Sequence, residues 1–141
     1  MTELSPALAD FLDAHIVGVL VTDPRQGHAR PSVVYYVRDG SQLLISTVAT
    51  RHKALDVAAS AWAALCVMGL ERPFPSATFS GPAEIRTKEI GAATALVAQR
   101  FMGAEQTPEP QTDAALAGVG RVILAITIER VASVSFIDVD A

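Results

Sequence analysis

Short apolar segments with many β-branched residues recur along this chain of 141 residues, and turn-forming residues separate them. Such segments are typical of β-strands. They cover residues 16–22, 29–38, 43–47, 62–69, 77–87, 121–130 and 132–137. Asp39 and Gly40 form a strong hairpin signal, which predicts that the second and third segments pair antiparallel. This succession favours a small antiparallel barrel of about six strands over an open parallel sheet.

Two of these strands carry features that bear on their position in a barrel. Side chains alternate along residues 29–38, so Tyr35 and Tyr36 must point to opposite faces, one toward the core and the other toward a cleft or a partner. Pro31 predicts that this strand begins at a sheet edge or a bulge. Gly81 and Pro82 interrupt residues 77–87, which predicts a bulge or a barrel corner there.

Helical spacing of apolar residues predicts short helices beside the strands. One begins at Ser5 and Pro6, a second covers about residues 50–60, and a third covers residues 88–102. Residues 103–120 contain many proline, glycine, threonine and glutamine residues, and we interpret them as the least ordered part of the chain and as a mobile flap. The length is that of one domain, residues 1–141.

Composition excludes several classes of function. The net charge is −4 and the basic residues are scattered, which argues against binding of nucleic acid or an anionic membrane. Cys66 is the only cysteine, so no disulfide can form within the chain, as is usual in the reducing cytoplasm. No segment resembles a signal peptide or reaches membrane-spanning length, so we expect a cytoplasmic protein. Because half of the residues are hydrophobic, we expect some apolar surface to be buried against a second copy.

The common catalytic and metal-binding motifs are absent. We find no glycine-rich dinucleotide fingerprint, no P-loop, no nucleophile elbow and no zinc-protease motif. His15, His28 and His52 are interpreted as surface residues, so no metal site is predicted. No catalytic residue can be named, and if the chain is an enzyme a cofactor must supply the chemistry.

The transition from strand to helix over residues 43–55 suggests an anion site. Arg51 and Lys53 stand at the start of the predicted helix, where the unpaired amides and the helix dipole already disfavour cations. A bound phosphate would remove this conflict, and hydroxyl groups for it are available on Ser46, Thr47 and Thr50. The alternative is that both cations are solvated surface charges with Asp56 as their partner. Spacing alone leaves both interpretations open.

The order of these elements resembles the flavin-binding split β-barrel family related to pyridoxamine 5′-phosphate oxidase. The resemblance covers nearly the whole chain and includes the pattern Ser46-Thr47 followed by Arg51-His52-Lys53, which is similar to the phosphate-binding signature of the family. It implies a mainly β (α+β) fold, a six-stranded antiparallel split β-barrel with short flanking helices. It also implies that the cofactor phosphate is bound by Ser46, Thr47, Arg51 and Lys53, with His52 at a position often filled by arginine.

The chain differs from the pyridoxamine phosphate oxidases proper, which tend to have serine where Arg51 stands and a longer carboxyl-terminal region. It looks more like the actinobacterial branch that uses coenzyme F420, a deazaflavin with a more anionic tail than FMN. Arg51 and Arg30 would suit that charge. The resemblance implies a homodimeric oxidoreductase with cofactor sites at the interface, which transfers hydride to an unsaturated small molecule. The alternatives are an FMN-dependent oxidoreductase and a non-catalytic carrier of flavin or haem.

Overall fold

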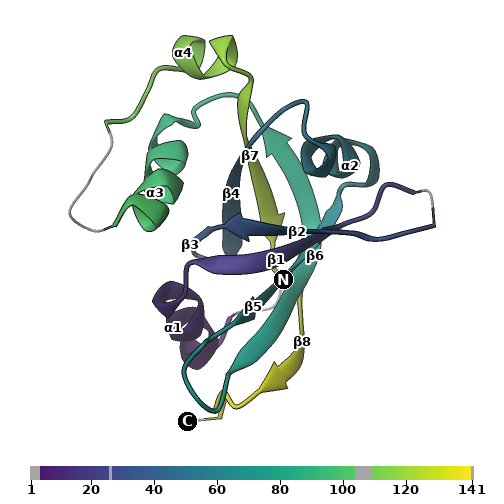
Figure 1. Ribbon diagram of the computed structural model, residues 1–141, viewed down its shortest axis with the longest axis vertical. Helices are drawn as coiled ribbons and strands as arrows, with labels where there is room; N and C mark the ends of the chain where they lie inside the picture. Colours follow the sequence, from purple (N-terminus) through teal and green to yellow (C-terminus); the bar gives the residue numbers. More distant parts are fainter. Residues whose placement is uncertain (1–3, 26, 104–108, 141) are drawn as a thin grey trace.

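The computed structural model describes residues 4–25, 27–103 and 109–140, which form eight strands and four helices (Figure 1). The helices are α1 (Pro6–Ala14), α2 (His52–Ser60), α3 (Gly91–Met102) and α4 (Asp113–Gly118). The strands are β1 (Val17–Thr22), β2 (Arg30–Tyr35), β3 (Val37–Asp39), β4 (Gln42–Val48), β5 (Trp62–Met68), β6 (Ser76–Arg86), β7 (Arg121–Thr127) and β8 (Arg130–Ser135). None of the helices in these ranges has the length and apolar character needed to cross a membrane.

All the strand pairs are antiparallel, and the sheet has the order β2-β1-β5-β6-β7-β4-β3, with β8 paired to β6. The first and last strands of this order, β2 and β3, are consecutive in the chain, so the sheet curls back on itself. The predicted antiparallel split-barrel class is therefore confirmed. Pro31 lies in the edge strand β2, as predicted, and Gly40 begins the predicted hairpin turn between β3 and β4.

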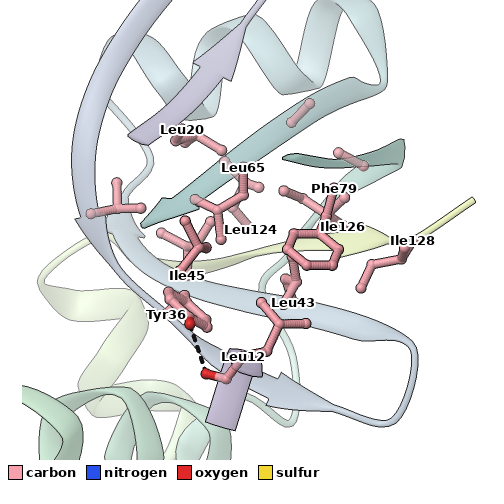
Figure 2. Close-up of a cluster of buried hydrophobic side chains, with 14 of the residues drawn as sticks. Leu12, Leu20, Tyr36, Leu43, Ile45, Leu65, Phe79, Leu124, Ile126 and Ile128 are labelled. Atoms are coloured by element: carbon pink, nitrogen blue, oxygen red, sulfur yellow. Dashed lines mark hydrogen bonds between the residues drawn. The ribbon is translucent and has the colours of Figure 1, made fainter. Parts of the chain in front are cut away.

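The described part of the chain forms eight strands instead of about six, since all seven predicted segments form strands and the segment 29–38 is broken at Tyr36. Tyr36 is fully buried, its hydroxyl donates a hydrogen bond to the carbonyl oxygen of Leu12 at 2.7 Å (Figure 2), and its amide donates to Ile16. Burial raises the pKa of Tyr36, so it remains a neutral donor. The contacts of this one residue end β2 and start β3, which pair with different neighbours.

The predicted barrel corner at Gly81 is confirmed. On its amino-terminal side β6 pairs with β5 and β8, and from Ala83 onward it pairs with β7. A Cβ atom added at Gly81 would lie 1.9 Å from the carbonyl oxygen of Thr127. The position therefore requires glycine, because only a residue without a side chain lets β7 pass so close to β6.

Two apolar clusters stabilise the fold. The larger one fills the inner side of the curved sheet and includes Leu20, Leu65 and Phe79 (Figure 2). The smaller one lies between the outer face of β4 and β7 and the helices α3 and α4, and consists of Leu44, Ile90, Leu116, Ile123 and Ala125. It fixes the two helices on one side of these strands, whereas α2 packs against β6 and β1 (Figure 1).

The expectation that residues 103–120 are the least ordered part of the chain is wrong for α4. The Thr112 side chain caps this helix by accepting a hydrogen bond from the amide of Ala115, and Leu116 is buried in the smaller cluster. The Asp113 carboxylate also accepts a hydrogen bond from the amide of Glu89, at the start of α3. Residues 104–108 lie outside the described residues, so the flap interpretation stays a prediction for them.

One ion pair joins α1 to β3 and gives a testable dependence on pH. Arg38 donates from Nε and Nη2 to the two carboxylate oxygens of Asp13 at 2.9 and 2.7 Å. The hydrogen bond from Arg38 is the main reason why the pKa of Asp13 lies below its ordinary value of 3.8. A lowered carboxyl pKa stabilises the fold above the pKa of the unfolded chain, and this stabilisation is lost as the pH falls through the folded-state pKa.

We therefore expect Asp13→Asn to lower the free energy of unfolding at pH 7 by at most about 1 kcal/mol, since the Asp13 side chain is half exposed. The difference from the wild type should shrink as the pH falls below 4, where the wild type loses the same charge. Urea denaturation across this pH range measures it. Asp10→Asn, an exposed site on the same helix, is the control, and a difference that persists unchanged at acid pH would contradict the assignment.

Candidate functional site

A cavity of about 710 Å³ lies between β2, the ends of β4 and β7 that are near α2, and the helices α3 and α4. Its volume is within the range of roughly 300–1,000 Å³ that is usual for small-molecule and cofactor sites. It is partly open to solvent. Two walls of different chemistry line it, one apolar and aromatic, the other polar and cationic, and the segment before α4 adds Glu109 and Gln111 to the lining.

The apolar wall is formed by β2 and α3. Val33 and Tyr35 project from the exposed face of β2, and Ala98 and Phe101 project from α3. The rings of Tyr35 and Phe101 are tilted by 42°, with their centroids 5.1 Å apart, and both remain about half exposed. The prediction that the two tyrosines take opposite roles is thus confirmed, since Tyr36 is in the core and Tyr35 lines the cavity. This wall offers an aromatic surface to a planar or apolar group.

The polar wall is formed by β4, β7 and the start of α2. Ser46, Lys53 and Arg121 line the cavity from these three elements. In the antiparallel register Ser46 is opposite Ile123 and Val48 is opposite Arg121, so Ser46 and Arg121 share one face of the β4–β7 pair. The same face carries the smaller apolar cluster, which covers the strands just beyond Ser46. The polar wall therefore lies at the margin of this cluster, where the helices leave the strands exposed to the cavity.

The start of α2 has the properties of an anion site. Arg51 occupies the N-cap position in an extended conformation, its side chain makes no capping hydrogen bond, and no acidic residue stands in the first turn. Burial, followed by the nearby charge of Arg51, lowers the pKa of Lys53. In the described part of the chain no ion pair involves either cation. Free amides and uncompensated positive charge at a helix start favour an anion there.

The structure brings only some of the predicted residues together. Ser46 and Lys53 line the same cavity. Thr50, Arg51 and His52 are exposed between β4 and the first turn of α2, next to Lys53 in the chain but not among the cavity-lining residues that the structure describes. Thr47 is buried on the opposite face of β4, because side chains alternate along a strand. Its hydroxyl therefore does not line the cavity.

Arg30 and Asp56 form a pair of their own. Arg30 Nε donates to the Oδ2 of Asp56 at 2.8 Å, and the Thr22 hydroxyl donates to the same oxygen at 2.8 Å. Asp56 is buried on the side of α2 that faces the sheet, so the interpretation that made it the partner of Arg51 and Lys53 is wrong. The pair fastens α2 to the β1–β2 hairpin and holds the helix start in place. The Arg30 side chain is engaged there and does not line the cavity.

Sequence analysis did not predict Arg121 or Phe101 as part of the cavity. Arg121 is the first residue of an apolar strand and carries no local sign of a site. Only the pairing of β7 with β4 brings it beside Ser46. Phe101 belongs to the apolar stripe of α3, which predicts a core position, yet the structure leaves it half exposed against Tyr35. The pairing of distant elements was the missing information in both cases.

Several solved structures are similar to this fold. An F420 reductase has a TM-score of 0.70 at 22% identity, with 87% of this chain and 94% of that chain covered. A FAD and haem binding protein from Mycobacterium smegmatis has a TM-score of 0.73 at 22% identity, with coverage of 92% and 70%. A FAD-binding protein from Mesorhizobium loti has a TM-score of 0.65 at 21% identity, with coverage of 92% and 94%. Identities this low establish a shared fold and nothing finer.

Family membership rests on the sequence itself. No curated protein matches the chain in sequence. The family model described as pyridoxamine 5′-phosphate oxidase, however, matches residues 4–135, which include all the strands, helices and cavity-lining residues that the structure describes. The chain belongs to the pyridoxamine 5′-phosphate oxidase family.

Proposed function

We propose that this protein is a coenzyme F420-dependent oxidoreductase that reduces an unsaturated small molecule. The observation that carries the proposal is the division of one cavity into a cationic wall at the start of α2 and an aromatic wall at Tyr35 and Phe101. An elongated cofactor with a planar ring at one end and an anionic tail at the other fits such a cavity. An F420 reductase and two FAD-binding proteins among the similar structures support a cofactor of this type.

The residues of the chain would bind and orient the cofactor. Lys53, the Ser46 hydroxyl and the amides at the start of α2 would hold a phosphate, and the exposed Arg51 would add long-range attraction. Tyr35 and Phe101 would contact the planar part and keep water from it. The bound deazaflavin would supply the hydride. We assign no catalytic acid or base, since orientation and exclusion of water are what this cavity offers.

We also propose a cytoplasmic homodimer with the cofactor sites at its interface. β1 and β2 expose a row of apolar side chains in register, with Val17 opposite Tyr35 and Val19 opposite Val33. Val33 is 72% exposed, and Tyr35 of the same row lines the cavity. A second copy on this face would bury the row and narrow the opening of the cavity. Sedimentation analysis tests the dimer, and a monomer at micromolar concentration would contradict it.

The first test is a titration of the purified protein with coenzyme F420 and with FMN at two salt concentrations. We expect F420 to bind more tightly than FMN and its affinity to fall as salt rises, because exposed charges are screened. A preference for FMN would instead favour the FMN-dependent alternative. If F420 binds but its reduced form transfers no hydride across a panel of conjugated acceptors, the protein is a carrier. Absence of binding to either cofactor would refute the proposal.

A further inference from the structure

Arg100 joins α3 to the junction between α1 and β1. Its Nη2 atom donates a hydrogen bond to the carbonyl oxygen of Asp13 at 3.1 Å and another to the carbonyl oxygen of His15. Asp13 is in the last turn of α1 and His15 is its C-cap, where the helix dipole favours a cation. The side chain is enclosed, since its Nε atom is buried and has no hydrogen-bond partner among the described residues. A buried donor without a partner costs free energy, so this anchor to α1 is made at some cost in stability.

The helix α3 is held unevenly along its length. Of its twelve residues, all of which the structure describes, only Val97 is buried. Its amino-terminal end is fixed by Ile90, which lies in the smaller apolar cluster. Beyond Val97 the helix has no buried residue, and Phe101 and Met102 are exposed. A helix end with so little apolar burial has low local stability, so polar contacts such as those of Arg100 determine where it lies.

The carbonyl of His15 is next in the chain to a contact that fixes Tyr35. Ile16 follows His15, and its carbonyl oxygen accepts a hydrogen bond from the amide of Tyr36. Tyr36 directly follows Tyr35, whose ring lies 5.1 Å from that of Phe101, measured between centroids. Phe101 in turn directly follows the anchored residue of α3. The hydrogen bonds at the junction between α1 and β1 therefore set the position of one ring relative to the other.

We propose that Arg100 is a positioning residue of the cavity, which acts through Phe101 by holding the aromatic wall in place for the planar part of the cofactor. The identity of that ligand rests on the proposed function. Arg100 itself is not among the cavity-lining residues that the structure describes, so it acts on the ligand only indirectly. A wall that is already in place binds a planar group more tightly, because no side chain or helix end has to be ordered during binding.

The test is a double-mutant cycle on the affinity for F420, measured by titration. We expect Phe101→Ala and Arg100→Met each to weaken binding by about 3- to 10-fold, in line with the loss of one aromatic contact. In the Phe101→Ala background, Arg100→Met should change the affinity by less than about twofold, because the group through which it acts is gone. In the Lys53→Gln background, which alters the other wall, Arg100→Met should keep its full effect.

Arg38→Met is the matched control. Arg38 binds the carboxylate of Asp13, so this variant loosens α1 at the same residue and leaves the hydrogen bonds to α3 in place. We expect it to change the affinity for F420 by less than about twofold. A second readout needs no cofactor: the nuclear Overhauser contact between the rings of Tyr35 and Phe101 should be lost in Arg100→Met and remain in Arg38→Met. Arg100→Lys, which can donate to the same two carbonyls, should restore both the ring contact and the affinity.

The other outcomes are equally decisive. Equal losses of affinity in Arg38→Met and Arg100→Met would mean that Arg100 acts only through the stability of α1, which overturns the proposal. Independent effects of Arg100→Met and Phe101→Ala, or a ring contact that survives Arg100→Met, would overturn it as well. If Arg100→Met does not fold, Arg100→Gln takes its place in the cycle with the same expected results. A wild type that binds neither F420 nor FMN refutes the proposed function, whereas loss of the ring contact in Arg100→Met would still confirm that Arg100 positions the wall.

Discussion

Phe79→Ala is expected to lower the free energy of unfolding by about 3–5 kcal/mol, the usual cost of removing a buried phenyl ring. Phe79 has no exposed surface and lies in the larger cluster, on the strand that pairs with β5, β7 and β8 (Figure 2). Truncation would leave a cavity that rigid neighbouring strands cannot fill. Since domains of this size are stable by roughly 5–15 kcal/mol, the variant should lose a large part of its stability.

Urea denaturation followed by circular dichroism measures this loss. Phe101→Ala is the matched control, because it removes the same atoms from a side chain that is 53% exposed. We expect the control to lose at most about 1.5 kcal/mol, the upper value for an aromatic pair such as that with Tyr35. Equal losses for both variants would mean that Phe79 does not occupy the centre of the core.

Lys53→Ala is expected to weaken binding of F420 about 10- to 100-fold, because a charge-assisted contact contributes roughly 1.5–3 kcal/mol. Lys53 is the predicted phosphate ligand that the structure places in the cavity wall without a partner among the described residues. Titration of the variant and the wild type at one salt concentration measures the effect. Lys88→Ala removes an exposed lysine outside the cavity and should leave the affinity unchanged.

The dependence of F420 affinity on pH is a second test of the proposed contact between Lys53 and the anion. Burial and Arg51 lower the pKa of Lys53 below its ordinary value of 10.5, and an anion binds the protonated form. Affinity should be constant below this lowered pKa and fall as the pH rises through it. Lys53→Arg should shift the fall to higher pH, since arginine keeps its charge. An identical pH profile for both proteins would show that Lys53 does not contact the anion.

Much of the fold is encoded in local sequence and could be predicted without the structure. Ser5 caps α1 by accepting a hydrogen bond from the amide of Leu8, and the turn after Asp39 joins β3 to β4. Both features were predicted from residues that are adjacent in the sequence. The alternation of side chains along a β-strand correctly assigned Tyr35 and Tyr36 to opposite faces, because this alternation depends only on the two-residue period of the strand. α4 was missed, since the contacts that hold it come from Glu89 and from the outer face of β4 and β7.

The residues of the candidate site, like the elements of the fold, could be predicted only where the deciding contacts are local in the sequence. Ser46 and Lys53 could be predicted because they lie seven residues apart in one strand–loop–helix unit, and helix-end electrostatics applies to any such unit. Thr47 and Arg30 were also predicted to bind the cofactor, but sequence spacing does not reveal the direction in which a side chain points. Burial turned the Thr47 side chain away from the cavity, and Asp56 engaged the Arg30 side chain.

The sequence by itself determined the strand and turn pattern, the family and the positive charge at the start of α2, because each depends on residues close together in the chain. The tertiary structure alone decided that Arg121 lies beside Ser46 and that Phe101 contacts Tyr35 in the apolar wall of the cavity. Sequence separations of 75 and 66 residues are bridged there by strand register and helix packing. These in turn depend on the whole core, so no local pattern specifies them.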